Sequence, residues 1–332
     1  MTMTTDKDNP DSGLLRRWVQ YAIENPRRVY RVLFYVAIVF FMVTTLFPFY
    51  WLFVLALTPE GQLLGGGYLP DIELFGLSTT FPLPVPQGFN PEAFIAVFEQ
   101  LPFHLYMLNS FVLAISTTVI VLVIASLAGY VFGRLEFAGR VPLMLAILAI
   151  SYFPPAALVV PLFEAFTGNT PIVIPFTEIP LFTPPRLLNT PGAMVMPFSA
   201  IFMPLSIFIL TTFYAQIPDG LEDAARVEGT TRFGALFRVI MPLSAPGVAT
   251  AAVLTFISVY NEYFFSSIMA TSPDAANWSP IVGGILSFQT QYTTQYNLMA
   301  AASIVAVLPV VILVLIAQER IVSGLTAGAL KE

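Results

Sequence analysis

Six long runs of apolar residues, separated by polar or proline-rich stretches, divide the chain. Each run has about 20 residues or more, the length that an α-helix needs to cross the hydrocarbon core of a bilayer. The pattern therefore predicts an all-α integral membrane protein. We expect six transmembrane helices, at 32–57, 105–132, 141–163, 191–213, 245–269 and 298–317.

The stretches between the runs predict two tails, external segments and one polar loop. Glycine, proline and aromatic residues fill the first external segment, where we expect little regular structure. Prolines forbid a membrane helix in the second, and the loop at 271–297 would be a third. We expect an N-terminal tail at 1–31, a first transmembrane helix at 32–57 and an external segment at 58–104. A core of five transmembrane helices then covers 105–319 and contains an external insert at 164–190 and a polar loop at 214–244. A C-terminal tail at 320–332 ends the chain.

The first half of the polar loop has the pattern of a surface helix. Pro218 and Asp219 indicate its start. Glu222 and Arg226 stand four residues apart, so we expect them to pair on the helix surface. Gly229 then predicts a turn, because glycine adopts backbone conformations that strain other residues.

The second half of the polar loop predicts another short helix, from 232 to 240, which Pro242 ends. Its apolar residues recur at the spacing of one helix face, so we expect a single apolar stripe. The stripe comprises Phe233, Leu236, Phe237 and Ile240. The chain thus leaves one membrane helix, forms a helix, a turn and a helix outside the lipid, and enters the next.

Composition supports a membrane protein and excludes several chemistries. The chain is 57% hydrophobic and 10% charged, with a mean hydropathy of +0.79, which exceeds what a soluble core of this size can bury. A net charge of −6 argues against nucleic acid as a partner. There is no cysteine, and His104 is the single histidine, which leaves little for a metal site. Lys7 and Lys331 are the two lysines, so no G-x-x-x-x-G-K phosphate loop can form.

The distribution of charge predicts the orientation of the chain. Lysine and arginine concentrate in cytoplasmic loops. With the N-terminus in the cytoplasm, all 14 basic residues except Arg186 fall on the cytoplasmic side. Six crossings return the C-terminus to that side, so the polar loop at 214–244 is expected to be cytoplasmic. The external side receives Glu60, Asp71, Glu73, Glu92, Glu99, Glu164, Glu178 and Asp274.

The polar loop resembles a known motif. The string EDAARVEG, followed after nine residues by VIMP, is similar to the EAA loop in the membrane subunits of binding-protein-dependent ABC importers. Asp223 replaces the usual glutamate, Val239 an isoleucine and Met241 a leucine. The motif positions fall on Asp223, Ala224, Ala225, Gly229, Val239, Met241 and Pro242.

Three further stretches resemble the carbohydrate branch of these permeases, the partner-subunit type of maltose-like systems. They are the second predicted span with its following loop (108–140), the aromatic and acidic segment VYNEYFF (259–265) and the tail GLTAGALKE (324–332). The resemblance covers about residues 103–332 and implies a type I ABC importer permease arrangement of six transmembrane helices with a cytoplasmic coupling-helix (EAA) loop.

The resemblance also implies partners and a role for the loop. Such permeases lie in the plasma membrane of a prokaryote, pair with a second permease, and receive solute from an external substrate-binding protein. Two ATP-binding subunits hold ATP and Mg, so this chain needs no cofactor of its own. The loop inserts a helix into a cleft on an ATP-binding subunit. The residues implied in this coupling are Leu221, Glu222, Asp223, Ala224, Ala225, Arg226, Glu228, Gly229 and Pro242.

A polar cluster within the fifth apolar run is the candidate for the substrate path. Sugars bind through hydroxyl hydrogen bonds and aromatic faces, and an ionisable residue at membrane depth is a functional candidate. The glutamate could instead pair with a helix of the partner permease or stabilise a kink. The cluster comprises Ser258, Tyr260, Asn261, Glu262 and Tyr263.

Three other interpretations remain open from the sequence. The polar loop could be an ordinary solvated connector between spans. The chain could be a secondary transporter driven by an ion gradient, although Glu262 alone is clearly at membrane depth. An intramembrane enzyme is a third class, but the spans lack cysteine, paired histidines and a clear acid dyad.

Overall fold

The computed structural model describes residues 26–329, apart from 64–70, 75–76, 81–84, 87, 170 and 178. The chain divides into two compact units, which are described separately. One contains most of helix α2 and the hairpin β1–β2; the other contains the remaining elements. Predictions that concern Lys7 and Lys331 lie outside the described residues.

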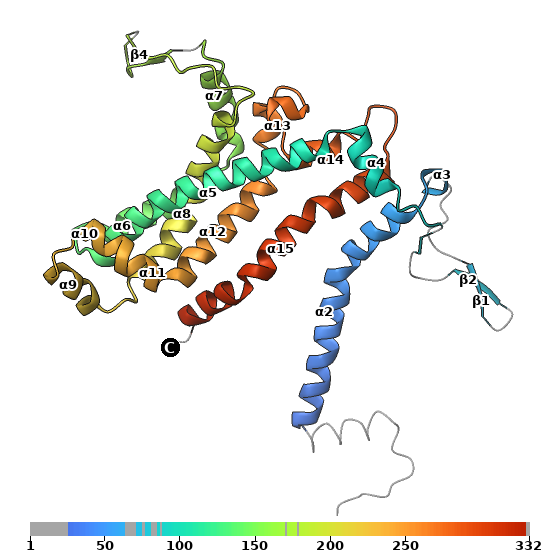
Figure 1. Cartoon of the computed structure of the whole chain (residues 1–332), viewed down its shortest axis with the longest axis horizontal. Helices are drawn as coiled ribbons and strands as arrows, with labels where there is room; N and C mark the ends of the chain where they lie inside the picture. Colours follow the sequence, from blue (N-terminus) through green and yellow to red (C-terminus); the bar gives the residue numbers. More distant parts are fainter. Residues whose placement is uncertain are drawn as a thin grey trace, which may run out of the picture. The chain divides into compact units, whose positions relative to one another are not determined.

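The described part of the chain is mostly helical (Figure 1). The helices are α2 (Pro26–Leu57), α3 (Glu60–Leu63), α4 (Ala93–Gln100), α5 (Phe103–Arg134), α6 (Arg140–Ile150), α7 (Ala156–Phe166), α8 (Gly192–Tyr214), α9 (Asp219–Val227), α10 (Arg232–Ala235), the π-helix η1 (Leu236–Ile240), α11 (Met241–Leu243), α12 (Ala245–Tyr260), α13 (Ser266–Met269), the 3₁₀ helix η2 (Ala275–Asn277), α14 (Ile281–Leu286) and α15 (Tyr296–Ala329). The strands are β1 (Asp71–Leu74), β2 (Leu77–Thr80), β3 (Ile172–Val173) and β4 (Pro180–Phe182).

Four described helices are long and apolar enough to cross a membrane: α2, α5, α8 and the Tyr296–Gln318 part of α15. The α10–α11 segment and α12 meet at a bend of 84°, and counting this pair as one span gives up to five. The predicted count of six continuous helices is therefore not reached among the described residues. The predicted runs in the third and fifth positions are interrupted.

The third predicted run, 141–163, consists of two short helices, which corrects the expectation of one continuous span. Helices α6 and α7 have 11 residues each. At about 1.5 Å per residue each is about 17 Å long, against a hydrocarbon core of about 30 Å. Pro154 and Pro155 lie in the break between them, where their rings and missing N–H groups end an α-helix.

The segments outside the membrane runs also differ from prediction. The first external segment contains the antiparallel hairpin β1–β2 and helix α4, and the external insert contains the antiparallel pair β3–β4. Helix α2 begins at Pro26, six residues before the predicted span at 32–57. Helix α15 continues to Ala329, so most of the predicted C-terminal tail is helical.

Helices α5 and α8 pack with their backbones unusually close. A Cβ atom on Gly129 would lie 3.0 Å from Leu210 Cβ, and one on Gly133 would lie 3.0 Å from the carbonyl oxygen of Thr211. Glycines four residues apart on one helix face permit such close packing of membrane helices. At the same contact the Tyr214 hydroxyl lies 3.1 Å from Ser126 Oγ, which fixes how α8 faces α5.

Helix α12 packs beside both α5 and α15 (Figure 1). Phe111 of α5 contacts Tyr260 of α12 edge-to-face, with ring centroids 5.3 Å apart. The Tyr260 hydroxyl donates to the carbonyl oxygen of Ala306 in α15 at 3.1 Å. The short helices α9 and α10 lie at one end of this bundle, and α7 and α13 lie at the opposite end.

The N-terminal part of α5 holds the loop that precedes α14. Asn109 Nδ2 donates to the carbonyl oxygens of Ala275 at 2.8 Å and Ser279 at 3.0 Å. The amide of Ile281 donates to Ser110 Oγ at 2.8 Å. Helix α5 therefore fixes the loop before α14 at one end and, as described below, the polar loop at the other.

We expect Gly133→Leu to lower the stability of the folded chain by about 1–3 kcal/mol, because the new side chain meets the backbone of α8 rather than a movable side chain. Gly61→Leu is the matched control, since nothing lies within 4 Å of a Cβ atom placed there. Thermal denaturation in detergent compares the two variants. Equal melting temperatures would contradict the close packing of α5 against α8.

Candidate functional site

The polar loop forms a helix and a tight turn at the places that the sequence predicts, and a second helix that begins at Arg232 as predicted. Pro242 does not end this second helix, because α10, η1 and α11 follow one another from Arg232 to Leu243. Helix α9 covers Asp219–Val227, and Gly229 has a left-handed backbone with φ of 91°. The amide of Gly229 donates to Arg226 O at 3.0 Å and that of Thr230 to Ala225 O at 3.1 Å. This pair of bonds is a Schellman motif, which satisfies the last carbonyls of a helix and favours glycine at this position.

Glu222 has a different partner from the one that its spacing predicts. Its carboxylate accepts from Arg134 Nε at 3.0 Å and from the hydroxyl of Tyr130, both on α5. Only 8% of the residue is exposed. Arg226 instead lies 3.7 Å from Asp223, three residues away. The predicted Glu222–Arg226 surface pair is therefore wrong, and Glu222 is not available as an acid for a partner subunit.

The remaining predicted coupling residues divide into an inner and an outer set. Ala225 is buried, whereas Ala224 is exposed. The outer apolar residues Leu221 and Val227 are 45% and 89% exposed. The other exposed members of the predicted set are Asp223, Arg226, Glu228, Gly229 and Pro242. Helix α9 therefore presents one acid–base pair and two apolar side chains outward.

The second helix of the loop is anchored in the core of the helix bundle. Leu236 and Ile240 are fully buried and join a cluster of residues from α5, α8 and α12. Phe233 and Phe237 are 67% and 46% exposed, which corrects the predicted single stripe. Ala235 is buried in their place, because a small side chain lets that face of the helix lie against the core. The spacing of large apolar residues alone did not reveal this rotation.

The predicted substrate-path cluster does not form one surface. Tyr260 is buried and bonded to α15, as described above. Ser258 and Asn261 are exposed, and each donates back to a carbonyl oxygen of its own helix, at 2.8 Å and 3.1 Å. Glu262 and Tyr263 are partly exposed. Tyr260 therefore lies in the core of the helix bundle. A solute contact by the other four residues of the cluster stays a prediction.

Glu262 marks the point at which the fifth predicted run breaks. Helix α12 ends at Tyr260, and the Glu262 carboxylate accepts from the amide of Phe265 at 2.8 Å and from the amide of Ser266 at 3.3 Å. The Ser266 hydroxyl adds a third bond at 2.9 Å. A carboxylate at this place satisfies the free N–H groups at the start of a helix. Glu262 thus stabilises the break between α12 and α13, and the predicted span at 245–269 is not continuous.

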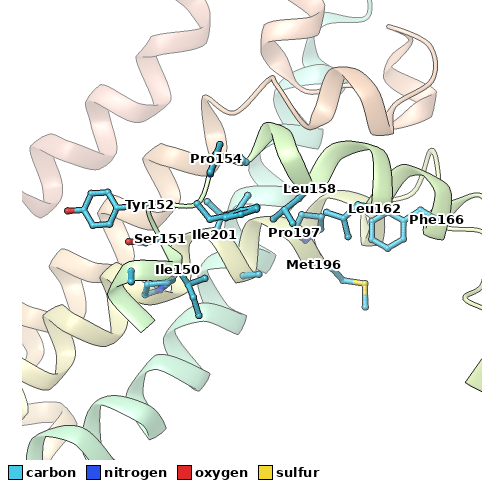
Figure 2. Close-up of a pocket in the computed structure, with 15 residues that line it drawn as sticks. Ile150, Ser151, Tyr152, Pro154, Leu158, Leu162, Phe166, Met196, Pro197 and Ile201 are labelled. Atoms are coloured by element: carbon cyan, nitrogen blue, oxygen red, sulfur yellow. The ribbon is translucent and has the colours of Figure 1, made fainter. Parts of the chain in front are cut away.

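An apolar cavity of about 930 Å³ lies beside the break between α6 and α7 (Figure 2). Residues 151–155 of the break line it, together with Leu158 and Leu162 of α7 and Pro197 and Ile201 of α8. No aspartate, glutamate, histidine, lysine or arginine lines this cavity. Within the described residues, no three histidine, cysteine or acidic side chains gather as a metal site.

Comparison with known proteins assigns the chain to a family. Residues 122–326 match the family described as "Binding-protein-dependent transport system inner membrane component". The chain belongs to this family, and it is a permease subunit of an ABC importer. Nothing in the comparisons favours a secondary transporter.

Curated relatives agree with this assignment, and a solved structure shares the fold. The chain is 33% identical over 297 residues to the sulfoquinovosyl glycerol transport system permease protein SmoH of Agrobacterium fabrum, covering 90% of this chain and 93% of that protein. It is 33% identical over 306 residues to the trehalose/maltose permease MalG of Thermococcus litoralis, covering 91% and 97%. A crystal structure of a bacterial ABC transporter that imports alginate has the same fold, with a TM-score of 0.67 at 17% identity, covering 88% of this chain and 96% of that one.

The buried position of Tyr260 gives a test of the predicted substrate path. We expect Tyr260→Phe to lower the free energy of unfolding by about 1 kcal/mol, because the Ala306 carbonyl oxygen loses its donor. The solute concentration that half-saturates transport should not change. Asn261→Ala at the exposed neighbour is the comparison variant. A shift in half-saturation for Tyr260→Phe would contradict its assignment to the helix core.

Proposed function

We propose that this chain forms the translocation path of an ATP-driven importer for a sugar or a related polyol, together with a second permease. Two ATP-binding subunits, which hold ATP and Mg, attach on the cytoplasmic side, and an external substrate-binding protein delivers the solute. The carbohydrate names of the relatives support the solute class, since they include trehalose, maltose, sulfoquinovosyl glycerol and arabinooligosaccharides.

The observation that carries this proposal is the two-sided construction of the loop at 214–244. Leu236 and Ile240 anchor it in the cluster of α5, α8 and α12, while α9 presents exposed charged and apolar side chains. A solvated connector needs no such anchorage. A short helix fixed to the transmembrane core and exposed on its outer face is suited to transmit movement from an ATP-binding subunit.

The exposed chemistry of α9 indicates how it would dock. Asp223 and Glu228 offer acids to arginine or lysine on the partner, and charge-assisted bonds of this kind are stronger than neutral ones. Leu221 and Val227 offer apolar contact beside them. Ala224 is small enough to let another surface approach the helix backbone closely.

The membrane topology follows from the same placement. We assign α6 and α7 to one crossing interrupted at residues 151–155, and α12 with its neighbouring segments to another. With α2, α5, α8 and α15 this makes six crossings, an even number that leaves both termini on one side of the membrane. We assign that side to the cytoplasm of a prokaryotic cell. The charge distribution supports this side for the loop at 214–244, because Arg226, Arg232 and Arg238 all fall within it.

The second permease would cover the face around the apolar cavity. Helix α6 has no buried residue, and Tyr152 in the following break is 87% exposed. Lipid can cover apolar side chains, but irregular backbone at membrane depth needs protein or a water-filled space beside it. A second subunit on this face would meet that need and would place the cavity next to the shared path.

Purification and reconstitution test the function. We expect the tagged chain to copurify with a second permease and an ATP-binding subunit, and solute import into liposomes to require ATP and the substrate-binding protein. A panel of sugars and polyols assayed for stimulation of ATPase activity would identify the solute. Transport without ATP by the chain purified alone would contradict the ABC importer mechanism, whichever solute is used.

Reversing a charge on α9 tests the docking surface. We expect Asp223→Arg to lower transport per ATP hydrolysed about tenfold, because the partner cleft would then face a like charge. Glu136→Arg is the matched control, since Glu136 is exposed near the same end of α5 but lies outside the loop. Unchanged substrate-stimulated ATPase and transport in the Asp223→Arg variant would exclude this residue from the interface.

A further inference from the structure

Arg134, at the end of α5, gathers three groups from the start of the polar loop. Its Nε donates to Glu222 Oε2 at 3.0 Å, and its Nη1 donates to the carbonyl oxygen of Ile217 at 2.5 Å. The same Nη1 lies 2.9 Å from Asp219 Oδ1. The hydroxyl of Tyr130, one turn earlier on α5, donates to the other oxygen of Glu222. One arginine and one tyrosine thus hold Ile217, two residues before α9, and the first four residues of α9.

Burial separates the strong contact in this group from the weak one. The side chains of Arg134 and Glu222 are 4% and 10% exposed, whereas that of Asp219 is 90% exposed. An exposed ion pair contributes little because water and salt screen it. A buried, hydrogen-bonded pair fixes geometry, and removing one partner leaves an uncompensated charge. The contact that holds α9 in place is therefore Arg134–Glu222, with Tyr130 completing the shell of the carboxylate.

This pair complements the anchor at the other end of α9. After the Gly229 turn, Thr231 caps the second helix by accepting from the amide of Gly234 at 3.1 Å. Leu236 and Ile240 then enter the core. Helix α9 is thus fixed to α5 at its N-terminal end by charge and to the bundle at its C-terminal end by apolar packing. A rotation of α9 relative to α5 would have to break the buried pair.

The geometry points to Arg134 and Glu222 as a positioning pair that makes α9 and α5 move as one body. This inference rests on the proposed coupling role of the loop at 214–244, and it adds the route by which movement enters the bundle. Helix α5 is the direct recipient, and α8 follows through the close contact at Gly133. Asp223 and Arg226, which face outward, would meet the ATP-binding subunit; Glu222 faces inward and acts through Arg134.

A double-mutant cycle in the complete reconstituted complex tests the pair. The variants are Glu222→Gln, Arg134→Gln and the double variant, each measured for ATPase rate, solute import and amount of assembled complex. Glutamine keeps the approximate size of glutamate and removes its charge. Glu136→Gln is the matched control, because it makes the same change on an exposed acid two residues beyond Arg134.

We expect each single variant to lower the solute imported per ATP hydrolysed about tenfold at an unchanged amount of complex. The double variant should be no worse than either single one, because residues that act as a unit give non-additive effects. A residue with a merely structural role would change the yield or melting temperature but not this ratio. An unchanged ratio in assembled Glu222→Gln complexes would overturn the inference. A loss in the double variant equal to the product of the two single-variant losses would overturn it too.

A spin label gives a second measurement if a variant assembles poorly. The chain has no cysteine, so Gly220→Cys provides a single labelling site, and nothing lies within 4 Å of a Cβ atom there. We expect the label to be more mobile when Glu222→Gln is added, and unchanged when Glu136→Gln is added. Equal mobility in all three chains would show that the pair does not hold α9.

The outcome also separates this inference from the docking proposal. If Asp223→Arg lowers transport per ATP but Glu222→Gln does not, the loop couples to the ATPase without using the buried pair. If neither variant changes the ratio, the coupling role of the loop itself is wrong.

Discussion

A membrane helix gains little specificity from apolar contact, since lipid tails are as apolar as a leucine side chain. The arrangement of this bundle therefore depends on a few close backbone contacts and buried polar bonds, and α5 carries most of them. Asn109 fixes the loop before α14 at one end of α5, Gly133 allows α8 to pack closely near the other end, and Arg134 holds α9 at that end. One helix thus links the loop before α14, the core of the bundle and the polar loop.

For the loop at 214–244, the sequence predicted the secondary structure better than it predicted the contacts. Proline, glycine and charge spacing gave the bounds of α9 and the turn at Gly229, because these signals are local. The partner of Glu222 could not be predicted from the sequence, because Arg134 lies 88 residues earlier and the spacing of neither residue indicates the other. In the sequence alone, an acid of a buried ion pair cannot be told apart from an exposed acid on a helix surface.

The number of membrane crossings was predictable from hydropathy only in outline. Runs 141–163 and 245–269 have the length and apolarity of spans, yet both are interrupted. Pro154 and Pro155 break the first, and Glu262 caps a new helix in the second. A window average counts apolar side chains and takes no account of where the backbone must leave its hydrogen-bonding pattern. The sequence singles out the polar residues in the fifth run, and the structure gives two of them, Tyr260 and Glu262, structural contacts.

The break between α6 and α7 has a further consequence for the polarity of the cavity beside it. The amides of Ser151, Tyr152 and Phe153 all donate back to the last turn of α6, and Pro154 and Pro155 have no N–H to donate. Among the backbone bonds of the described residues, the carbonyl oxygens of 151–153 accept none. This stretch of main chain therefore offers acceptors without spare donors, the opposite of the start of a helix. Carbonyl oxygens of this kind bind groups that donate hydrogen bonds, such as hydroxyls, and repel anions.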